Sequence, residues 1–199
     1  MRKVPLSSCL AIAGLLSACG NTREAKEPTL PSLHSEAEAI LAMRAPRYSG
    51  TGDKADAIQF IKSDIGAWVV RRKHATDALI SKYEAARSHA SGPGVALMYA
   101  DVARLLYDFS REFNDAGAAS VPSAIRADSR SYDAYLGALA QAMVPELSRA
   151  IREAEECVAV AQASEVSTAV ECQRTKHDAA LLRGKASPSV PSLDGATRL

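Results

Sequence analysis

Aromatic side chains are scarce in this chain of 199 residues, which holds one Trp, six Tyr and three Phe and is 5% aromatic in total. An excess of charge of one sign is also missing, because 24 Lys and Arg stand against 23 Asp and Glu. Nucleic-acid binding requires a basic surface that such a balance does not provide. We therefore expect no nucleic-acid partner.

The motifs of common enzyme classes are missing as well. The chain has no G-x-S-x-G, G-x-G-x-x-G or G-x-x-x-x-G-K sequence. Its histidines are scattered outside any H-E-x-x-H or C-x-x-C-H pattern, at His34, His74, His89 and His177. We therefore expect no catalytic residues, no cofactor and no metal site.

Long apolar runs are limited to "VPLSSCLAIAGLL", which follows the cationic "MRK" at the start of the chain. This run is shorter than the roughly 20 apolar residues that a membrane-spanning helix requires. A short cationic segment followed by such a run is typical of an export signal. We therefore predict a signal peptide over residues 1–18.

The signal ends in Leu16-Ser17-Ala18-Cys19, which resembles the lipobox of bacterial lipoproteins. The resemblance implies that the thiol of Cys19 receives a diacylglyceryl group, that cleavage follows Ala18 and that the new amino terminus is acylated. Two or three acyl chains hold a protein firmly on a membrane, whereas one chain does not. An ordinary secretory signal with an incidental cysteine is the alternative.

Gly20 follows Cys19, at the place where Asp retains a lipoprotein of this kind in the inner membrane. The resemblance therefore implies a lipid-anchored protein of the outer membrane, which we expect to face the periplasm. Pro28 and Pro31 lie among polar residues after the anchor, so we expect a flexible tether over residues 19–34.

The chain from residue 35 onward has the size and the apolar periodicity of one domain. We predict an all-helical domain over residues 35–184. The Pro, Ser and Gly of "GKASPSVPSLDGATRL" predict a disordered tail over residues 185–199.

Apolar residues recur in steps of three and four through this domain, which is typical of helices. The alternation of apolar and polar residues that is typical of strands is missing. The sequence predicts a short helix over 35–44 and a long helix with Asp53 as its N-cap. The apolar stripe of the long helix is interrupted at Arg72 and Lys82 and consists of Ile58, Ile61, Ile65, Trp68, Ala75, Leu79 and Ala86.

Further helices follow each proline-containing break. One has Pro93 in its first turn, and the next begins near Pro122 or Asp128 and kinks or restarts at Pro145. A last helix is predicted over 164–182, with Val166, Val170, Cys172 and Leu181 available for burial. The predicted fold class is therefore all-α, as an antiparallel helical bundle or a short helical array.

Cys157 and Cys172 lie on either side of a turn that we expect at Ser164, the predicted N-cap of the last helix. Each Cys lies about seven residues, or roughly 11 Å of helix, from that turn, so the two face each other across a hairpin. Export leads to an oxidising compartment, and we therefore predict a disulfide between them. The alternative is a thiol pair for metal or redox work, with only His177 nearby as a further ligand.

Part of the chain resembles the C-terminal module of tetratricopeptide-type cell-envelope proteins. The resemblance is carried by two stretches, "ALMYADVARLLYDFSREF" and "SYDAYLGALAQAMVPELSRAIREAEECVAVAQASEVSTAVECQR". The shared pattern is an aromatic-rich helix, a Pro-led loop at Pro122, a long helix with an internal Pro, and a Cys on each of the last two helices. The resemblance covers residues 58–182 and implies a short tetratricopeptide-like array with a scaffolding role. The 34-residue repeat of a full array is missing.

The sequence thus favours a non-enzymatic envelope lipoprotein that acts as a protein–protein interaction or scaffold module, with a protein partner in the cell envelope. Such modules bind partner helices or peptides in a groove. The candidates for lining it, or alternatively for filling the core, are Trp68, Tyr83, Tyr99, Tyr107, Tyr132 and Tyr135. Two other functions stay open: a periplasmic helical bundle that binds a small ligand or a metal, and a hydrolase of envelope polymers.

Overall fold

The computed structural model describes residues 29–164 and 167–186, and these residues form helices and loops without a strand. The predicted all-α fold is thereby confirmed. The predicted signal peptide, Cys19 and residues 187–199 of the predicted tail lie outside the described residues. The helices are α1 (Leu30–Leu41), α2 (Lys54–Phe60), the π-helical η1 (Ile61–Ile65), α3 (Gly66–Arg87), α4 (Gly92–Ala119), α5 (Ser123–Arg126), α6 (Ser129–Ala142), α7 (Val144–Ala163) and α8 (Thr168–Gly184).

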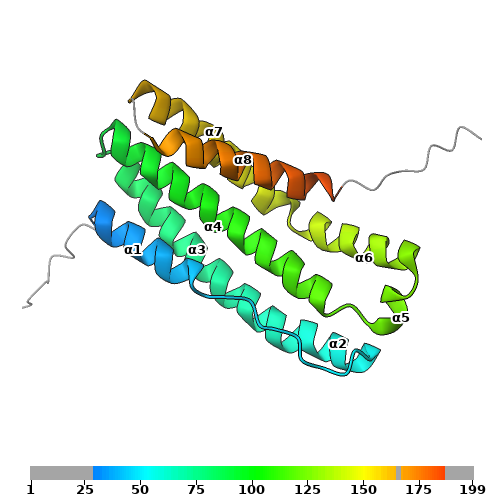
Figure 1. Ribbon diagram of the computed structural model, residues 1–199. Helices are drawn as coiled ribbons and strands as arrows, with labels where there is room; N and C mark the ends of the chain where they lie inside the picture. Colours follow the sequence, from blue (N-terminus) through cyan, green and yellow to red (C-terminus); the bar gives the residue numbers. More distant parts are fainter. Residues whose placement is uncertain (1–28, 165–166, 187–199) are drawn as a thin grey trace, which may run out of the picture.

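Helix α4 lies at the centre of an elongated antiparallel bundle and packs against α1, α3, α6, α7 and α8 (Figure 1). One end of the bundle holds the start of α1, the α3–α4 turn, the end of α7 and the start of α8 (Figure 1). Gly94 lies so close to Leu30 there that an added Cβ would be 3.3 Å from Leu30 Cδ2. The described chain therefore enters the bundle at the end where α3 passes into α4.

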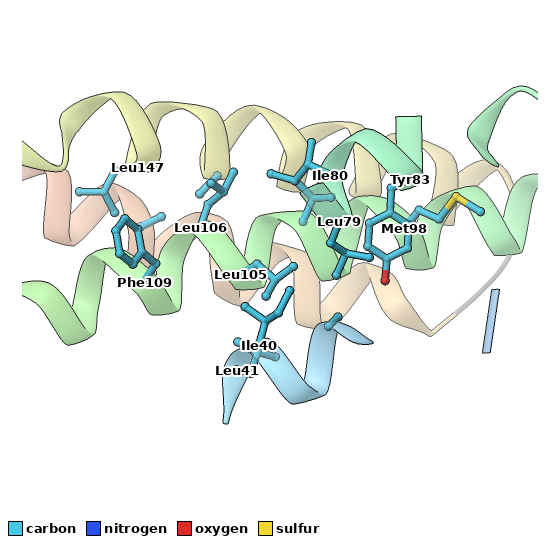
Figure 2. Close-up of a cluster of buried hydrophobic side chains, with 14 of the residues drawn as sticks. Ile40, Leu41, Leu79, Ile80, Tyr83, Met98, Leu105, Leu106, Phe109 and Leu147 are labelled. Carbon is cyan, nitrogen blue, oxygen red and sulfur yellow. The ribbon is translucent and has the colours of Figure 1, made fainter. Parts of the chain in front are cut away.

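The core consists of apolar side chains from the inward faces of α1, α3, α4 and α7 (Figure 2). Leu79, Leu105 and Leu147 are fully buried, and Leu106 and Phe109 extend the same cluster along α4. Burial of a side chain of this size contributes about 1.5–3 kcal/mol relative to exposure. The heptad-like spacing of these residues is what packs the helices side by side.

The predicted start signals at Asp53, Asp128, Pro93 and Pro145 act at the predicted residues. The Asp53 carboxylate accepts a hydrogen bond from the backbone N–H of Asp56, at 2.8 Å, and so caps α2. Asp128 caps α6 in the same way through the N–H of Ser131. Pro93 lies in the first turn of α4, and Pro145 lies in the first turn of α7, which restarts after α6 ends.

The first helix begins earlier than predicted. It starts at Leu30, within residues 19–34 that the sequence assigned to the tether, and it ends at Leu41 rather than Arg44. Pro31 lies in its first turn, where a missing N–H costs nothing. Leu33 is buried against the core, so burial of this side chain extends the helix into the polar segment.

The predicted stripe of the long helix is wrong at Ile58, which is 40% exposed. The π-helical turn η1 contains one more residue than an α-helical turn, and it shifts the phase of α2 relative to α3. Ala57 and Phe60 therefore face the core instead, in line with Ile65 and Trp68.

The last hairpin confirms the predicted disulfide, which joins Cys157 on α7 to Cys172 on α8 with 6.1 Å between their Cα atoms. The predicted N-cap is corrected, because Ser164 ends α7 and α8 begins after Ser167. Ala179 takes part in the buried side of α8, whereas Val170 and Leu181 point outward.

Two further predictions concern this hairpin and the residues after it. Val166, which was predicted to be available for burial, lies outside the described residues. Helix α8 runs to Gly184, and Ala186, which the sequence assigned to the disordered tail, is buried.

Candidate functional site

The six candidate aromatic residues do not form one groove. Trp68 and Tyr83 are buried in the core, so their side chains are closed to a partner. Trp68 packs against Phe109, with 5.4 Å between the ring centroids, and donates a hydrogen bond from Nε1 to the backbone oxygen of Met43. These two residues take the core role that the sequence offered as the alternative.

The other four tyrosines are partly buried and lie at separate places. Tyr99 on α4 lies under Arg87 of α3, whose guanidinium carbon is 3.8 Å from the ring centroid. Tyr107 lies further along α4, and burial raises its pKa above the ordinary value, as does the nearby charge of Asp178 on α8.

The remaining two candidates, Tyr132 and Tyr135, lie on α6. Tyr135 donates a hydrogen bond to the backbone oxygen of Gly117, at 3.2 Å, and Tyr132 lies one turn before it. The contacts of Tyr99, Tyr107 and Tyr135 thus involve different helices or different parts of α4.

A first polar cluster lies inside the bundle between α3, α4 and the α1–α2 connection. Arg72 is fully buried and donates one hydrogen bond to Asp108 Oδ2, at 2.9 Å, and another to the Met43 carbonyl, at 2.8 Å. Trp68 donates to that same carbonyl. A buried guanidinium is stable only when such partners surround it, so Arg72 fixes the position of Met43 on the core.

The second part of this cluster lies one turn along α4. Glu112 accepts hydrogen bonds from the Arg44 side chain and, at 2.6 Å, from the backbone N–H of Ala45. Arg111 pairs with Asp108. We call Arg44, Arg72, Asp108 and Glu112 the inner cluster. It holds the α1–α2 connection to the central helix through charge-assisted hydrogen bonds.

A second cluster joins α1, α3 and α4. The Nδ1 atom of His34 lies 2.9 Å from Asp101 Oδ2, and Tyr83 donates its hydroxyl hydrogen to the same oxygen at 2.6 Å. The hydrogen bond with Asp101 raises the pKa of His34, which is part-exposed. Burial raises the pKa of Asp101 because desolvation outweighs these two hydrogen bonds, and burial also raises that of Tyr83.

A half-exposed histidine backed by a buried aspartate is an acid–base arrangement in some enzymes. Here the only hydroxyl that the described residues bring to the pair is that of Tyr83, and it binds Asp101 from the interior rather than His34. This cluster therefore ties three helices together. Flanking ion pairs, Lys82–Glu36 and Arg104–Glu38, reinforce the same junction.

Sequence reasoning missed both clusters, although signals for them exist. Arg72 interrupts the apolar stripe of α3 at a position that faces the core. On α4, Asp101, Asp108 and Glu112 recur at steps of seven and four, which is one face of a helix. Ionisable residues of opposite charge at inward positions of two helices are compatible with buried pairing, but the local pattern does not identify the partners.

The outward face of α8 is the clearest exposed feature. Val170 is 66% exposed and Leu181 is 58% exposed. They lie eleven residues apart on one line of the helix, about 16 Å from end to end, with the exposed Arg174 and His177 between them. We call Val170, Arg174, His177 and Leu181 the α8 stripe. Its spacing of four, three and four residues is that of a helix-packing seam.

Two shallow hollows follow the seam between α7 and α8 beside this stripe, with volumes of about 440 and 340 Å³. The larger lies toward the end of α8, between Ser148 and Arg183, and the smaller lies toward its start, between Ala159 and Gln173. An ion pair between Lys176 and Glu155, at 2.9 Å, crosses the smaller hollow. Both hollows are open troughs on the surface of the hairpin.

Within residues 29–164 and 167–186, no three His, Cys, Asp or Glu side chains converge as metal ligands. The helices of the same ranges include none that is both apolar enough and long enough to span a bilayer. Comparisons of the chain with family models, with curated proteins and with solved structures found no match.

Proposed function

We propose that this chain is a non-enzymatic lipoprotein of the bacterial cell envelope that acts as a protein–protein interaction or scaffold module. In this proposal Cys19 carries the lipid, the anchor lies in the outer membrane and the helical body faces the periplasm. The lipobox-like Leu16-Ser17-Ala18-Cys19 supports the anchor. The resemblance to the C-terminal module of tetratricopeptide-type envelope proteins supports the scaffolding role.

The observation that carries the interaction role is the α8 stripe. Two large apolar side chains on one line of a surface helix are costly to leave in water, and covering each contributes up to about 1.5–3 kcal/mol. Apolar residues rimmed by charged ones are typical of protein contact surfaces. The disulfide behind the stripe holds α8 in place before a partner arrives, which reduces the ordering cost of binding.

In this proposal the two polar clusters join the anchored end of the chain to the bundle. They fasten α1 and the α1–α2 connection to the centre of the bundle. Helix α1 starts at Leu30, and the eleven residues from Cys19 reach at most about 36–40 Å when fully extended. A lipid on Cys19 therefore keeps the start of α1 within about 40 Å of the membrane surface.

The first experiment is mass spectrometry of the protein purified from its own membrane, as the intact chain and after peptide mapping. We expect an amino-terminal peptide that begins at Cys19 and carries three acyl chains. Cys19→Ala releases the protein from the membrane fraction, whereas the matched variant Cys9→Ala, inside the predicted signal peptide, leaves it there. An unlipidated amino terminus contradicts the anchor.

The interaction role is tested by chemical crosslinking in the same membranes. We expect crosslinked protein species in which the peptide of this chain comes from α8. Leu181→Asp removes them, and Val70→Asp, on the outer face of α3 and 69% exposed, retains them. Crosslinks that survive Leu181→Asp unchanged contradict the assignment of this role to α8.

A further inference from the structure

The α8 stripe has a self-complementary order. Its apolar residues, Val170 and Leu181, lie at the two ends, and Arg174 and His177 lie in the middle. A two-fold symmetric interface places a surface patch against the same patch in reverse. Reversal of this stripe puts Val170 of each copy opposite Leu181 of the other, and it puts Arg174 opposite His177.

The charges on α8 favour the same antiparallel arrangement. A parallel pair of α8 helices would place the two Arg174 side chains together, which repels. The antiparallel pair instead places Arg174 beside His177 and Asp178 of the second copy. Within the part of the chain that the structure describes, neither Arg174 nor Asp178 takes part in an ion pair. Arg174 is exposed, whereas Asp178 is half-buried and lies near Tyr107 of α4.

We propose that the α8 stripe is the docking surface for a second copy of this chain, with α8 packed antiparallel against α8. This inference rests on the proposed membrane anchor, because copies confined to one membrane have a high effective concentration and need only a small contact. A two-fold axis perpendicular to the membrane places the starts of both α1 helices at one height. The bundles then lie along the membrane rather than standing on it.

Two histidines that follow similar basic residues provide a matched pair of positions for an experiment. His177 lies in Arg174-Thr175-Lys176-His177 on α8, and His74 lies in Arg71-Arg72-Lys73-His74 on α3. Both histidines are exposed on the outer side of their helix. The full chain is made with a photoreactive residue at one position or the other, as His177→p-benzoylphenylalanine or His74→p-benzoylphenylalanine, and is irradiated in its membrane.

The expected product from position 177 is a covalent dimer of this chain, in which mass spectrometry locates the new bond near Arg174 of the second copy. Position 74 yields no dimer. Val170→Asp lowers the dimer yield about tenfold, which corresponds to a loss of about 1.4 kcal/mol in association. Val70→Asp, a valine of equal exposure on α3, leaves the yield unchanged.

The remaining outcomes overturn the inference, and each is distinguishable from failure of the proposed function. A crosslink from position 177 to a different protein removes the second copy as the occupant but agrees with an interaction module. Absence of any crosslink from a chain whose Cys19 carries its lipid removes α8 as the docking surface. The mass of the Cys19 peptide shows separately whether the chain carries its lipid.

Discussion

His34 on α1 and Asp101 on α4 form an ion-pair contact across 67 residues of sequence, with 2.9 Å between His34 Nδ1 and Asp101 Oδ2. The carboxylate is buried, while the histidine side chain is 42% exposed. The pair therefore places a group that titrates near neutral pH at the junction between the first helix and the centre of the bundle.

Stability is predicted to fall as the pH rises above neutrality. The fold raises the pKa of His34, so this side chain binds its proton more tightly in the folded chain than in the unfolded one. The raised pKa of Asp101 acts in the same direction, but from its unfolded value of 3.8 in the acid range. Such groups contribute stability at low pH that is lost as the pH rises. For His34 the contribution is complete below its unfolded pKa of 6.5 and is lost as the pH passes through its raised folded pKa.

The measurement is urea unfolding at about pH 6 and about pH 9. Because His34 is partly exposed, solvent screening limits the expected loss to roughly 0.5 kcal/mol. His34→Gln should flatten this part of the pH dependence, while His74→Gln, on the exposed side of α3, should leave it unchanged. An unchanged slope in His34→Gln contradicts the role given to His34.

Arg72→Leu is predicted to destabilise the fold by about 3 kcal/mol, because it removes the buried donor to the Asp108 carboxylate and one of the two donors to the Met43 carbonyl. The neighbouring Arg71→Leu removes an exposed guanidinium and should change the free energy of unfolding by less than about 0.5 kcal/mol. Chemical denaturation of both variants gives the comparison. Equal effects would show that Arg72 does not act through burial.

Reduction of the Cys157–Cys172 disulfide is predicted to cost about 3 kcal/mol, since the bond closes a short loop in the unfolded chain. Denaturation with and without a reductant measures this loss. A double variant, Cys157→Ala with Cys172→Ala, should be as unstable as the reduced protein and should not respond to the reductant. A response of the double variant would mean that the reductant acts elsewhere.

Two helical glycines are predicted to respond differently to alanine. Gly137 on α6 has open space around an added Cβ, so Gly137→Ala should stabilise the protein by about 0.5–1 kcal/mol through helix propensity. At Gly117 on α4 the new Cβ would lie 2.7 Å from Leu139 Cδ1 on α6. The clash should cancel that gain or reverse it. Thermal unfolding of both variants tests the α4–α6 contact.

Periodicity and helix-start residues predicted most of the helices because these signals are local, although the start predicted at Ser164 was wrong. Asp53, Asp128 and the prolines of α4 and α7 act within one turn of their own positions. The disulfide was predictable for a similar reason, since it lies within one hairpin. The start of α1 was not, because burial of Leu33 depends on helices far along the chain.

The polar clusters could not be predicted from local pattern alone. Arg72 and Asp108 are 36 residues apart, and an arginine within an apolar stripe has the same local pattern whether it is solvated or paired in the core. The aromatic residues posed the same difficulty. Trp68 and Tyr83 find buried hydrogen-bond acceptors only because Met43 and Asp101 are brought to them by the tertiary fold.

The π-helical turn at Ile61–Ile65 has a consequence for any alignment of this chain with a relative that lacks the turn. A relative with a regular α-helix here would have one residue fewer, so a gap belongs within 61–65. Without that gap, Ile58 would be matched to an inward position that Ala57 and Phe60 take in this fold. Deletion of one residue from the turn should convert it to a regular α-helical turn and keep Ala57 and Phe60 on the inward face, with Ile58 still exposed.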